Sequence, residues 1–459
     1  MIKKGILLFG LSLLILSCES NDDSEYVDFD LSERLYAGGQ TTIFSATSIA
    51  FRTPAPNLST SDLEMHFLGD TQFEAIFVTA PSNVNSGLGP IFNNSSCISC
   101  HPNDGRADFP TNLANRSGLL VRASIAGFDE FGGPNPVPGF GTQIQNQAIL
   151  GYIPEARYEA TFISKTETFA DGTTISLQRP IVTLTNPYIS LPSGLMLSTR
   201  LATPVFGLGL LEAIPEANII ANQDINDANG DGISGKANYV WDPFTQQTIL
   251  GRFGWKANTG TILMQCAAAY VEDMGITSFV FPNETGHNQS NGQDGFNDDP
   301  EIMNSAVDQV VLYCKTLAVP APRNITNSNV KEGARLFENL QCAKCHIPKQ
   351  MTGSSPISAL AYQTIYPYTD LLLHDMGEDL ADNRPDFLAT GREWKTRPLW
   401  GIGLTGLING HTTFLHDGRA KNLTEAILWH GGEAQQSREK FKQLSLEKRN
   451  MLLAFLNSL

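Results

Sequence analysis

Positive charge is scarce in this chain of 459 residues, which carries 31 Lys and Arg against 47 Asp and Glu. A formal net charge of −16 is a poor match for a polyanion, so nucleic acid is not an expected partner. Long apolar runs are scarce too. The run Gly5–Leu16 is too short to span a bilayer as a permanent helix. The chain is therefore not expected to be threaded through a membrane.

The N-terminus nevertheless has the pattern of an exported lipoprotein. Lys3 and Lys4 precede the apolar run, and "ILSC" places the small Ser17 before Cys18. This order predicts a signal peptide over residues 1–17, lipid on Cys18 and a flexible tether over residues 18–40. An ordinary signal peptide with an incidental cysteine is the alternative. We expect an exported protein with a lipid anchor in the outer membrane, at its periplasmic face or at the cell surface.

Cysteine is also sparse, with seven residues in the chain, and four of them form two C-x-x-C-H motifs. The motif residues are Cys97, Cys100, His101, Cys342, Cys345 and His346. A zinc ribbon takes four ligands from paired knuckles, but these pairs lie far apart and each has its own histidine. A thioredoxin-like pair needs a βαβ context, which the flanking sequence lacks. C-x-x-C-H is the attachment motif of c-type haem, so we predict two covalently attached haems.

Cys266 and Cys314 remain, in two apolar, helix-like stretches. In an oxidising compartment they could form a disulfide, and they could equally be buried free thiols. The sequence leaves both interpretations open.

The apolar patterning predicts a mainly α chain with two cytochrome c-like haem domains. The first is expected over residues 41–320 with a β-rich insertion at about 121–250, and the second over 325–459, after a Pro-containing linker. Within the insertion, Asp171–Gly172 between alternating runs predicts a β-hairpin.

Local signals place two helices in the second domain. Gly333 and Phe337 share one face of the helix that leads into the second motif, which favours close packing on another helix. Ser445 is the predicted N-cap of the C-terminal helix.

A metal-binding loop is a further candidate. Asp227, Asn229 and Asp231 followed by Gly232 match the start of a calcium loop, although Asn238 stands where the final Glu is expected. An Asn- and Gly-rich turn is the alternative. The segment 291–301 is a weaker calcium candidate.

Four long segments carry a resemblance to a known family. They are "GLGPIFNNSSCISCHPNDGRADFP", "DANGDGISGKANYV", "RFGWKANTGTILMQCAAAYVEDMGIT" and "FLHDGRAKNLTEAILWHGGEA". They resemble the bacterial di-haem oxidoreductases, described as peroxidases or thiol oxidoreductases, over most of residues 40–459. That family is similar to the di-haem cytochrome c peroxidases and to the di-haem enzyme that matures methylamine dehydrogenase. The peroxidase resemblance covers only the haem-bearing segments.

The resemblance implies a second ligand for the C-terminal haem. In the similar peroxidases this ligand lies fourteen residues after the His of an "HDG"-like turn, and here that spacing leads from His416 to His430. His430 would then complete bis-His ligation with His346. His430 as a simple helix cap is the alternative, and His374 and Met376 are rival ligands.

The resemblance also implies catalytic residues at the first haem. Trp255 matches a Trp between the haems, and Gln265, ten residues on, matches a distal Gln. Glu272 matches a distal Glu at a shorter spacing than in the relatives, and Arg397 matches a segment that lines the second haem and could pair with a propionate. Core and surface roles are the alternatives.

These parts predict a peroxidase-like oxidoreductase in which electrons pass from the C-terminal haem to the N-terminal haem. A small cytochrome or cupredoxin would donate the electrons, and peroxide or another small molecule would be the substrate. No histidine follows His101 closely, so the first haem is expected to have an open face, with the upstream His66 as the rival ligand. The alternative is a non-catalytic di-haem electron-transfer lipoprotein, with a role in metal acquisition as one option.

Overall fold

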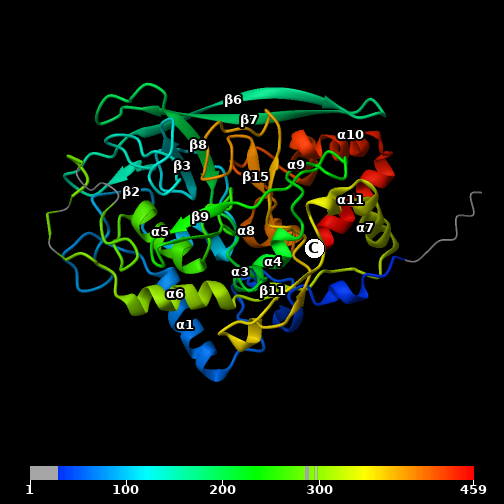
Figure 1. Ribbon diagram of the computed structural model, residues 1–459, viewed down its shortest axis with the longest axis horizontal. Helices are drawn as coiled ribbons and strands as arrows, with labels where there is room; N and C mark the ends of the chain where they lie inside the picture. The colour runs from blue at the N-terminus through cyan, green and yellow to red at the C-terminus, as the bar shows by residue number, and fades with distance from the viewer. Residues whose placement is uncertain (1–28, 285–288, 294, 297) are drawn as a thin grey trace, which may run out of the picture.

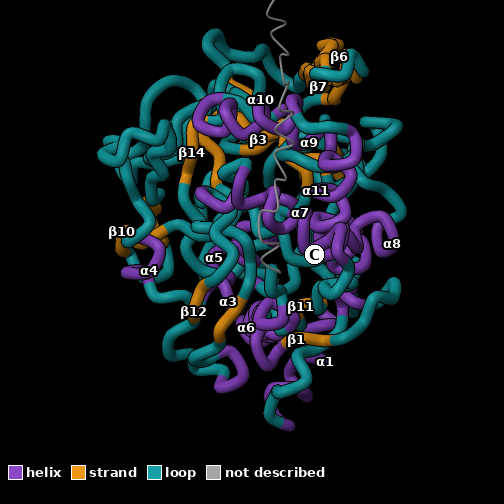
Figure 2. Tube along the Cα trace, turned by 90° about the vertical axis from the view of Figure 1, so that its right-hand side faces the viewer, coloured by secondary structure: helices purple, strands orange, loops and turns teal. Residues whose placement is uncertain are grey.

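The computed structural model describes residues 29–459 apart from 285–288, 294 and 297 (Figure 1). Helices make up 30% and strands 19%, in small sheets, so the fold is mixed and the expectation of a mainly α chain is met only in part. Long loops join the elements (Figure 2). The predicted signal peptide and Cys18 lie outside the described residues. Within the described part, no helix is both long and apolar enough to cross a membrane.

One pair of crossed helices builds the N-terminal region. Helix α1, Thr60–Glu74, packs on α6, Asn304–Thr316, and α6 also packs on α5, Ile262–Met274. The crossing depends on Gly69, where a Cβ atom would lie 2.1 Å from the carbonyl oxygen of Gln309. Helix α2, Cys97–Cys100, carries the first motif and lies against α1.

A second crossing builds the C-terminal region. Helix α7, Ser328–Asn339, packs on α11, Leu446–Ser458, and a Cβ atom on Gly333 would lie 2.0 Å from the carbonyl oxygen of Met451. The prediction that the Gly333 face packs on another helix is confirmed. Ser445 is also confirmed as an N-cap, because its Oγ accepts the Lys448 N–H. Helices α9, Leu423–Trp429, and α10, Gln435–Gln443, complete this region.

The insertion contains an antiparallel sheet and a long hairpin. In the sheet, β3, Leu119–Ser124, lies between β4, Gln143–Ile144, and β8, Met196–Leu201. The hairpin pairs β6, Arg157–Thr168, with β7, Thr174–Thr185, around the predicted Asp171–Gly172 turn. That turn prediction is confirmed.

The hairpin runs along one side of the molecule and ends against the C-terminal helices (Figure 1). At its tip, Asp171 forms an ion pair with Arg449 at 2.6 Å. The Arg449 guanidinium also lies 3.9 Å from the ring centre of Phe169, which packs against Phe441. The insertion therefore braces the C-terminal region as well as the N-terminal one.

Two segments expected to be loose are part of the packed structure. Strand β11, Val319–Pro320, belongs to the predicted linker and pairs in parallel with β1, Thr42–Ile43. Leu31 is 2% exposed, so residues assigned to the tether pack against the C-terminal core.

The remaining elements are short. They are η1 Ser32–Leu35, η2 Gly39–Thr41, η3 Ala50–Arg52, β2 Ile91–Phe92, η4 Pro102–Asp104, β5 Gln147–Ala148, α3 Leu208–Glu212, α4 Glu216–Ile220, β9 Tyr239–Asp242, β10 Gln247–Leu250, η5 Cys342–Lys344, β12 Gln350–Met351, η6 Ser358–Leu360, β13 Thr364–Ile365, β14 Leu373–Asp375, β15 Glu393–Lys395, η7 Ile402–Leu404, α8 Thr405–Asn409 and η8 Gly432–Ala434.

Candidate functional site

Two large cavities surround the two motifs. The first cavity is lined by Cys97, Cys100 and His101, and the second by Cys342, Cys345 and His346. The empty space within each cavity, including the open solvent at its mouth, is about 1500 Å³ for the first and about 1880 Å³ for the second.

The local fold leaves one nitrogen of each motif histidine available. The Nδ1–H of His101 donates to the carbonyl of Thr203 at 2.6 Å, and that of His346 donates to the carbonyl of Tyr368 at 3.0 Å. A carbonyl can only accept, so these bonds fix the tautomer and leave Nε2 with its lone pair. Burial lowers the pKa of both imidazoles, that of His346 to about 4, which keeps both neutral near pH 7.

His430 lies on the second cavity with His346, as the spacing predicted. It is the C-cap of α9, and its Nδ1–H donates to the carbonyl of Ala426 at 2.7 Å, so its Nε2 is available in the same way. After burial, the nearby His430 is the largest cause of the lowered pKa of His346, which indicates that the two rings lie close together.

The rival residues have different environments. His374 also lines the second cavity, but its Nε2 faces a carboxylate oxygen of Asp370 at 2.8 Å and its Nδ1 faces one of Glu433 at 2.6 Å. No ring nitrogen of His374 is therefore available to a metal. Met376 lines the same cavity.

His66 does not lie among the described residues that line the first cavity. Its Nδ1 is 2.7 Å from the hydroxyl oxygen of Thr316, its side chain is 1% exposed, and burial lowers its pKa to about 4. It packs between α1 and α6 as a core histidine.

Helix α5 carries the residues predicted to be catalytic. Gln265 and Glu272 both line the first cavity. Gln265 accepts a hydrogen bond from the hydroxyl of Thr259 at 2.8 Å, and Glu272 accepts one from the hydroxyl of Thr142 at 2.9 Å. The second oxygen of Glu272 forms an ion pair with Arg122.

Asp273 adds a second carboxyl group to this wall. It lines the first cavity, and one of its oxygens accepts a hydrogen bond from the amide of Gln143 at 2.7 Å. Burial raises the pKa of Asp273 to about 7. The wall therefore contains one ion-paired carboxylate and one carboxyl group that titrates near neutral pH.

No local pattern assigned insertion residues to this wall, yet polar side chains from three strands of the insertion line the first cavity. Arg122 comes from β3, Gln143 from β4 and Arg200 from β8. Alternation along β3 buries Leu119 and Val121 in the insertion core and turns Arg122 toward the cavity. Alternation was visible in the sequence, but the identity of the facing wall was not.

The two cavities share a wall. The residues that line both are Thr203, Leu208, Leu211, Trp255, Lys395, Arg397 and Pro398. The indole Nε1–H of Trp255 donates to the carbonyl of Leu201 at 2.8 Å, which fixes the ring in this wall. The guanidinium of Arg397 lies 5.0 Å from the Trp255 ring centre. Trp255 thus lies in the wall that is common to both cavities.

Cations without carboxylate partners surround this shared wall. Arg106, Lys395 and Arg397 form no ion pair with any residue that the structure describes. Burial lowers the pKa of Arg106 to about 9, that of Arg397 to about 10, and that of Lys395 well below its ordinary value. Buried cations need a counter-charge, so the wall is suited to an anionic group of a ligand.

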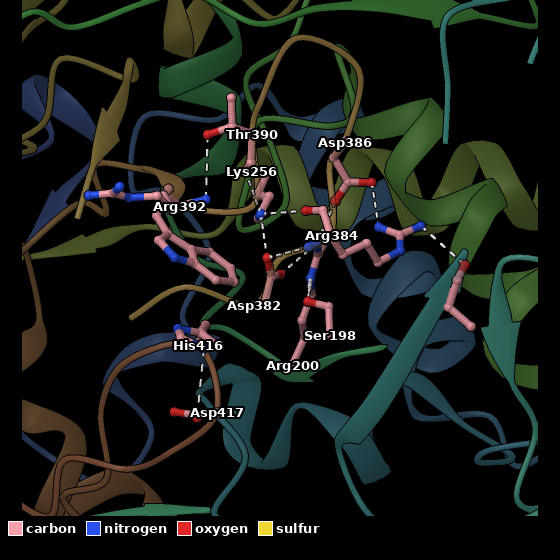
Figure 3. A network of polar contacts seen from close by, with 12 residues as sticks. Ser198, Arg200, Lys256, Asp382, Arg384, Asp386, Thr390, Arg392, His416 and Asp417 are labelled. Atoms are coloured by element: carbon pink, nitrogen blue, oxygen red, sulfur yellow. Dashed lines mark hydrogen bonds and ion pairs between the residues drawn. The ribbon is translucent and has the colours of Figure 1, made fainter. Parts of the chain in front are cut away.

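A buried network of ion pairs and hydrogen bonds lies next to the shared wall and includes Lys256, the residue after Trp255 (Figure 3). Lys256 is 0% exposed and donates to Asp382 and to the carbonyls of Arg384 and Thr390, at 2.7, 2.7 and 2.8 Å. Arg200 forms an ion pair with Asp386. Because Lys256 follows Trp255 in the chain, these bonds hold the indole in place.

The predicted calcium loop satisfies its own polar groups. Both carboxylate oxygens of Asp227 accept the Gly232 N–H, and the Asn229 side chain accepts the Asp231 N–H. Asp231 forms an ion pair with Lys344 at 2.9 Å. Among the residues with described placement, no group of three or more His, Cys, Asp and Glu is arranged to hold a metal ion. Calcium binding stays a prediction.

Two other predictions concern the segment 291–301 and the two cysteines outside the motifs. The weaker calcium candidate, 291–301, lies partly outside the described residues. Cys266 and Cys314 are free thiols in the structure, and both line the first cavity.

The residues present fit two c-type haems. Each cavity offers two thiols for thioether bonds, a neutral histidine with a free Nε2 and a mostly apolar lining. The three cations, Arg106, Lys395 and Arg397, carry the charge opposite to that of the haem carboxylates. The residues of both cavities thus fit a di-haem protein.

Comparison with protein families agrees with this class. The chain belongs to the family described as "Di-haem oxidoreductase, putative peroxidase", whose model matches residues 31–459. It is therefore a member of an oxidoreductase family. A search of curated proteins found no match.

Proposed function

We propose that this protein is a di-haem peroxidase that reduces peroxide to water at the first cavity. The observation that carries the proposal is a difference between the cavities: His430 lines the second cavity together with the motif histidine, whereas Gln265, Glu272 and Arg122 line the first. One hydrogen peroxide, two electrons and two protons would give two water molecules.

The haems are proposed to be attached through the four motif cysteines. His101 would ligate the first iron, and His346 and His430 would ligate the second. Haem iron supplies the coordination site for peroxide and the capacity to take up and release electrons one at a time. Arg397, together with Arg106 and Lys395, would bind the haem carboxylates at the shared wall.

Proton handling is assigned to α5. The Glu272 carboxylate would accept the proton of one peroxide oxygen and return it to the other, so that the departing oxygen leaves as water. Gln265, fixed by its bond to Thr259, would hold peroxide or a water molecule by hydrogen bonds. Neither residue needs to move far, because both already line the cavity.

Electrons are proposed to pass from the second haem to the first through Trp255, which lies in the wall common to both cavities. A small cytochrome or cupredoxin would be the donor. An exported protein with lipid on Cys18 would meet such donors outside the cytoplasm, in keeping with the sequence pattern of residues 1–18.

Electron paramagnetic resonance of the oxidised and half-reduced holoprotein tests the proposal. We expect a high-spin signal that changes when peroxide is added, beside a low-spin signal from a bis-His haem. Two low-spin signals that ignore peroxide in both redox states would contradict the peroxidase and leave the electron carrier.

A further inference from the structure

The ion pair between Arg122 and Glu272 joins the insertion to the helix proposed to handle protons. Arg122 belongs to β3 and Glu272 to α5, 150 residues apart in the chain. Their side chains are 16% and 19% exposed, and both line the first cavity. The pair is therefore largely shielded from bulk water. Ion pairs that are fully exposed to water contribute little to stability, and this pair is not one of them.

Both oxygens of Glu272 have donors, which limits how the carboxylate can rotate. One oxygen accepts from Thr142 at 2.9 Å and the other pairs with Arg122. Arg122 is itself oriented, because its guanidinium donates to the side chain of Gln143 at 3.0 Å. Gln143 is the cross-strand partner of Arg122. The sheet of the insertion thus sets the direction of a side chain on α5.

The charges in this pair are complementary. Burial alone would lower the pKa of the Arg122 guanidinium, but the Glu272 carboxylate raises that pKa above its ordinary value. Asp273 on α5, Arg200 on β8, and Lys395 and Arg397 of the shared wall also line this cavity. Arg200 pairs with Asp386, and Arg122 is the cation that pairs with Glu272.

We propose that Arg122 is a positioning residue that holds the Glu272 carboxylate in the orientation that accepts a proton from a ligand of the first haem. This inference rests on the proposed function, because it assumes a haem with an open face in the first cavity. It assigns the insertion a part in the chemistry in addition to its structural role.

Cyanide binding to the ferric holoprotein isolates this step from turnover. Hydrogen cyanide gives its proton to a base as it binds as the anion, so the binding rate falls at low pH when the base is protonated. The binding rate is measured by absorbance across the pH range in the wild type, R122Q, R122K, T142V and E272Q. R34Q is the control, because Arg34 also forms an ion pair, with Glu338 at 3.0 Å, and its side chain is 17% exposed.

In R122Q the acid midpoint of the rate profile should move up by about one pH unit or more. The reason is that an adjacent opposite charge lowers the pKa of a carboxyl group by about 1–3 units, and R122Q removes that charge. At a pH below both midpoints, the rate should be about tenfold lower than in the wild type. R122K and R34Q should keep the wild-type midpoint, T142V should show a smaller upward shift, and E272Q should lack the acid limb.

The outcomes separate the two proposals. If cyanide binds but R122Q keeps the wild-type midpoint, Arg122 is not a positioning residue and the peroxidase proposal stands. If the wild type does not bind cyanide, the open first haem is wrong and both proposals fall. If R122Q does not retain both haems, T142V and R122K decide, and an unshifted T142V profile overturns the role of the ordered carboxylate.

Discussion

The two haem-motif regions have the same scaffold but differ in what faces the motif histidine. In each, helices cross at a glycine, Gly69 or Gly333, and a backbone carbonyl holds Nδ1 of the histidine. His430 lines the second cavity, whereas polar side chains of α5 and the insertion line the first. A shared scaffold therefore presents different side chains, because the rest of each cavity comes from a different part of the chain.

The regions also differ just after the motif. Three residues beyond His101 stands Asp104, which is 1% exposed and bonded to the hydroxyl of Tyr313 at 2.8 Å. Three residues beyond His346 stands Lys349, a surface residue that pairs with Glu33 at 3.3 Å. Only the first region carries a buried acid at this place.

The largest expected effect comes from removing one motif at a time. Cys97→Ala with Cys100→Ala should leave one covalent haem and abolish peroxide reduction, because the proposed reaction site is lost. Cys342→Ala with Cys345→Ala should also leave one haem but preserve a reaction of the first haem with peroxide. Haem content per chain and stopped-flow spectra after peroxide addition measure both. Equal behaviour of the two double variants would remove the proposed division of labour.

Exchanging the ligand of the second haem should have the next largest effect. His430→Met should raise the reduction potential of that haem by on the order of 100 mV, because Met stabilises the ferrous state relative to His. Spectroelectrochemical titration measures the change. Met376→Leu is the control and should leave the potential and the low-spin signal unchanged. A shift in Met376→Leu and none in His430→Met would make Met376 the ligand.

Asp104 should give the first region a pH dependence of stability that has no counterpart at Lys349, the corresponding position of the second region. Burial raises its pKa to about 7, so the folded state binds a proton that the unfolded state releases above the ordinary value of 3.8. Relative to Asp104→Asn, the free energy of unfolding of the wild type should fall by on the order of 3 kcal/mol between about pH 4 and pH 7. It should fall no further above pH 7.

Urea denaturation at several pH values measures this difference in the free energy of unfolding. Lys349→Met, at the corresponding place of the second motif, should follow the wild-type curve. If the Asp104→Asn and wild-type curves are parallel, Asp104 does not titrate as the structure indicates.

The smallest expected effect concerns the feature that the regions share. Gly69→Ala and Gly333→Ala should each destabilise the protein by about 1–3 kcal/mol, because a Cβ atom would overlap a carbonyl of the partner helix and force the helices apart. Thermal unfolding of the holoprotein measures both. A loss in one variant only would show that the two crossings are not equivalent.

Local signals were sufficient for part of this structure. The cap at Ser445 and the turn at Asp171–Gly172 depend on a few neighbouring residues, so they could be predicted and are confirmed. The pairing of β11 with β1 and the docking of the hairpin on Arg449 join residues hundreds of positions apart. No local pattern specifies such partners, so the Pro-containing segment that includes β11 was predicted to be a linker.

The sequence by itself determined the family and the number of haem motifs, because C-x-x-C-H places its groups within one turn of chain. The resemblance singled out Trp255, Gln265, Glu272 and His430, and the structure shows that each of them lines one or both cavities. Only the tertiary structure decided that Arg122 stands beside Glu272 and that three cations without an ion-pair partner among the described residues surround the shared wall. Side-chain alternation turns a strand residue to one face, but the packing of distant segments decides what that face meets.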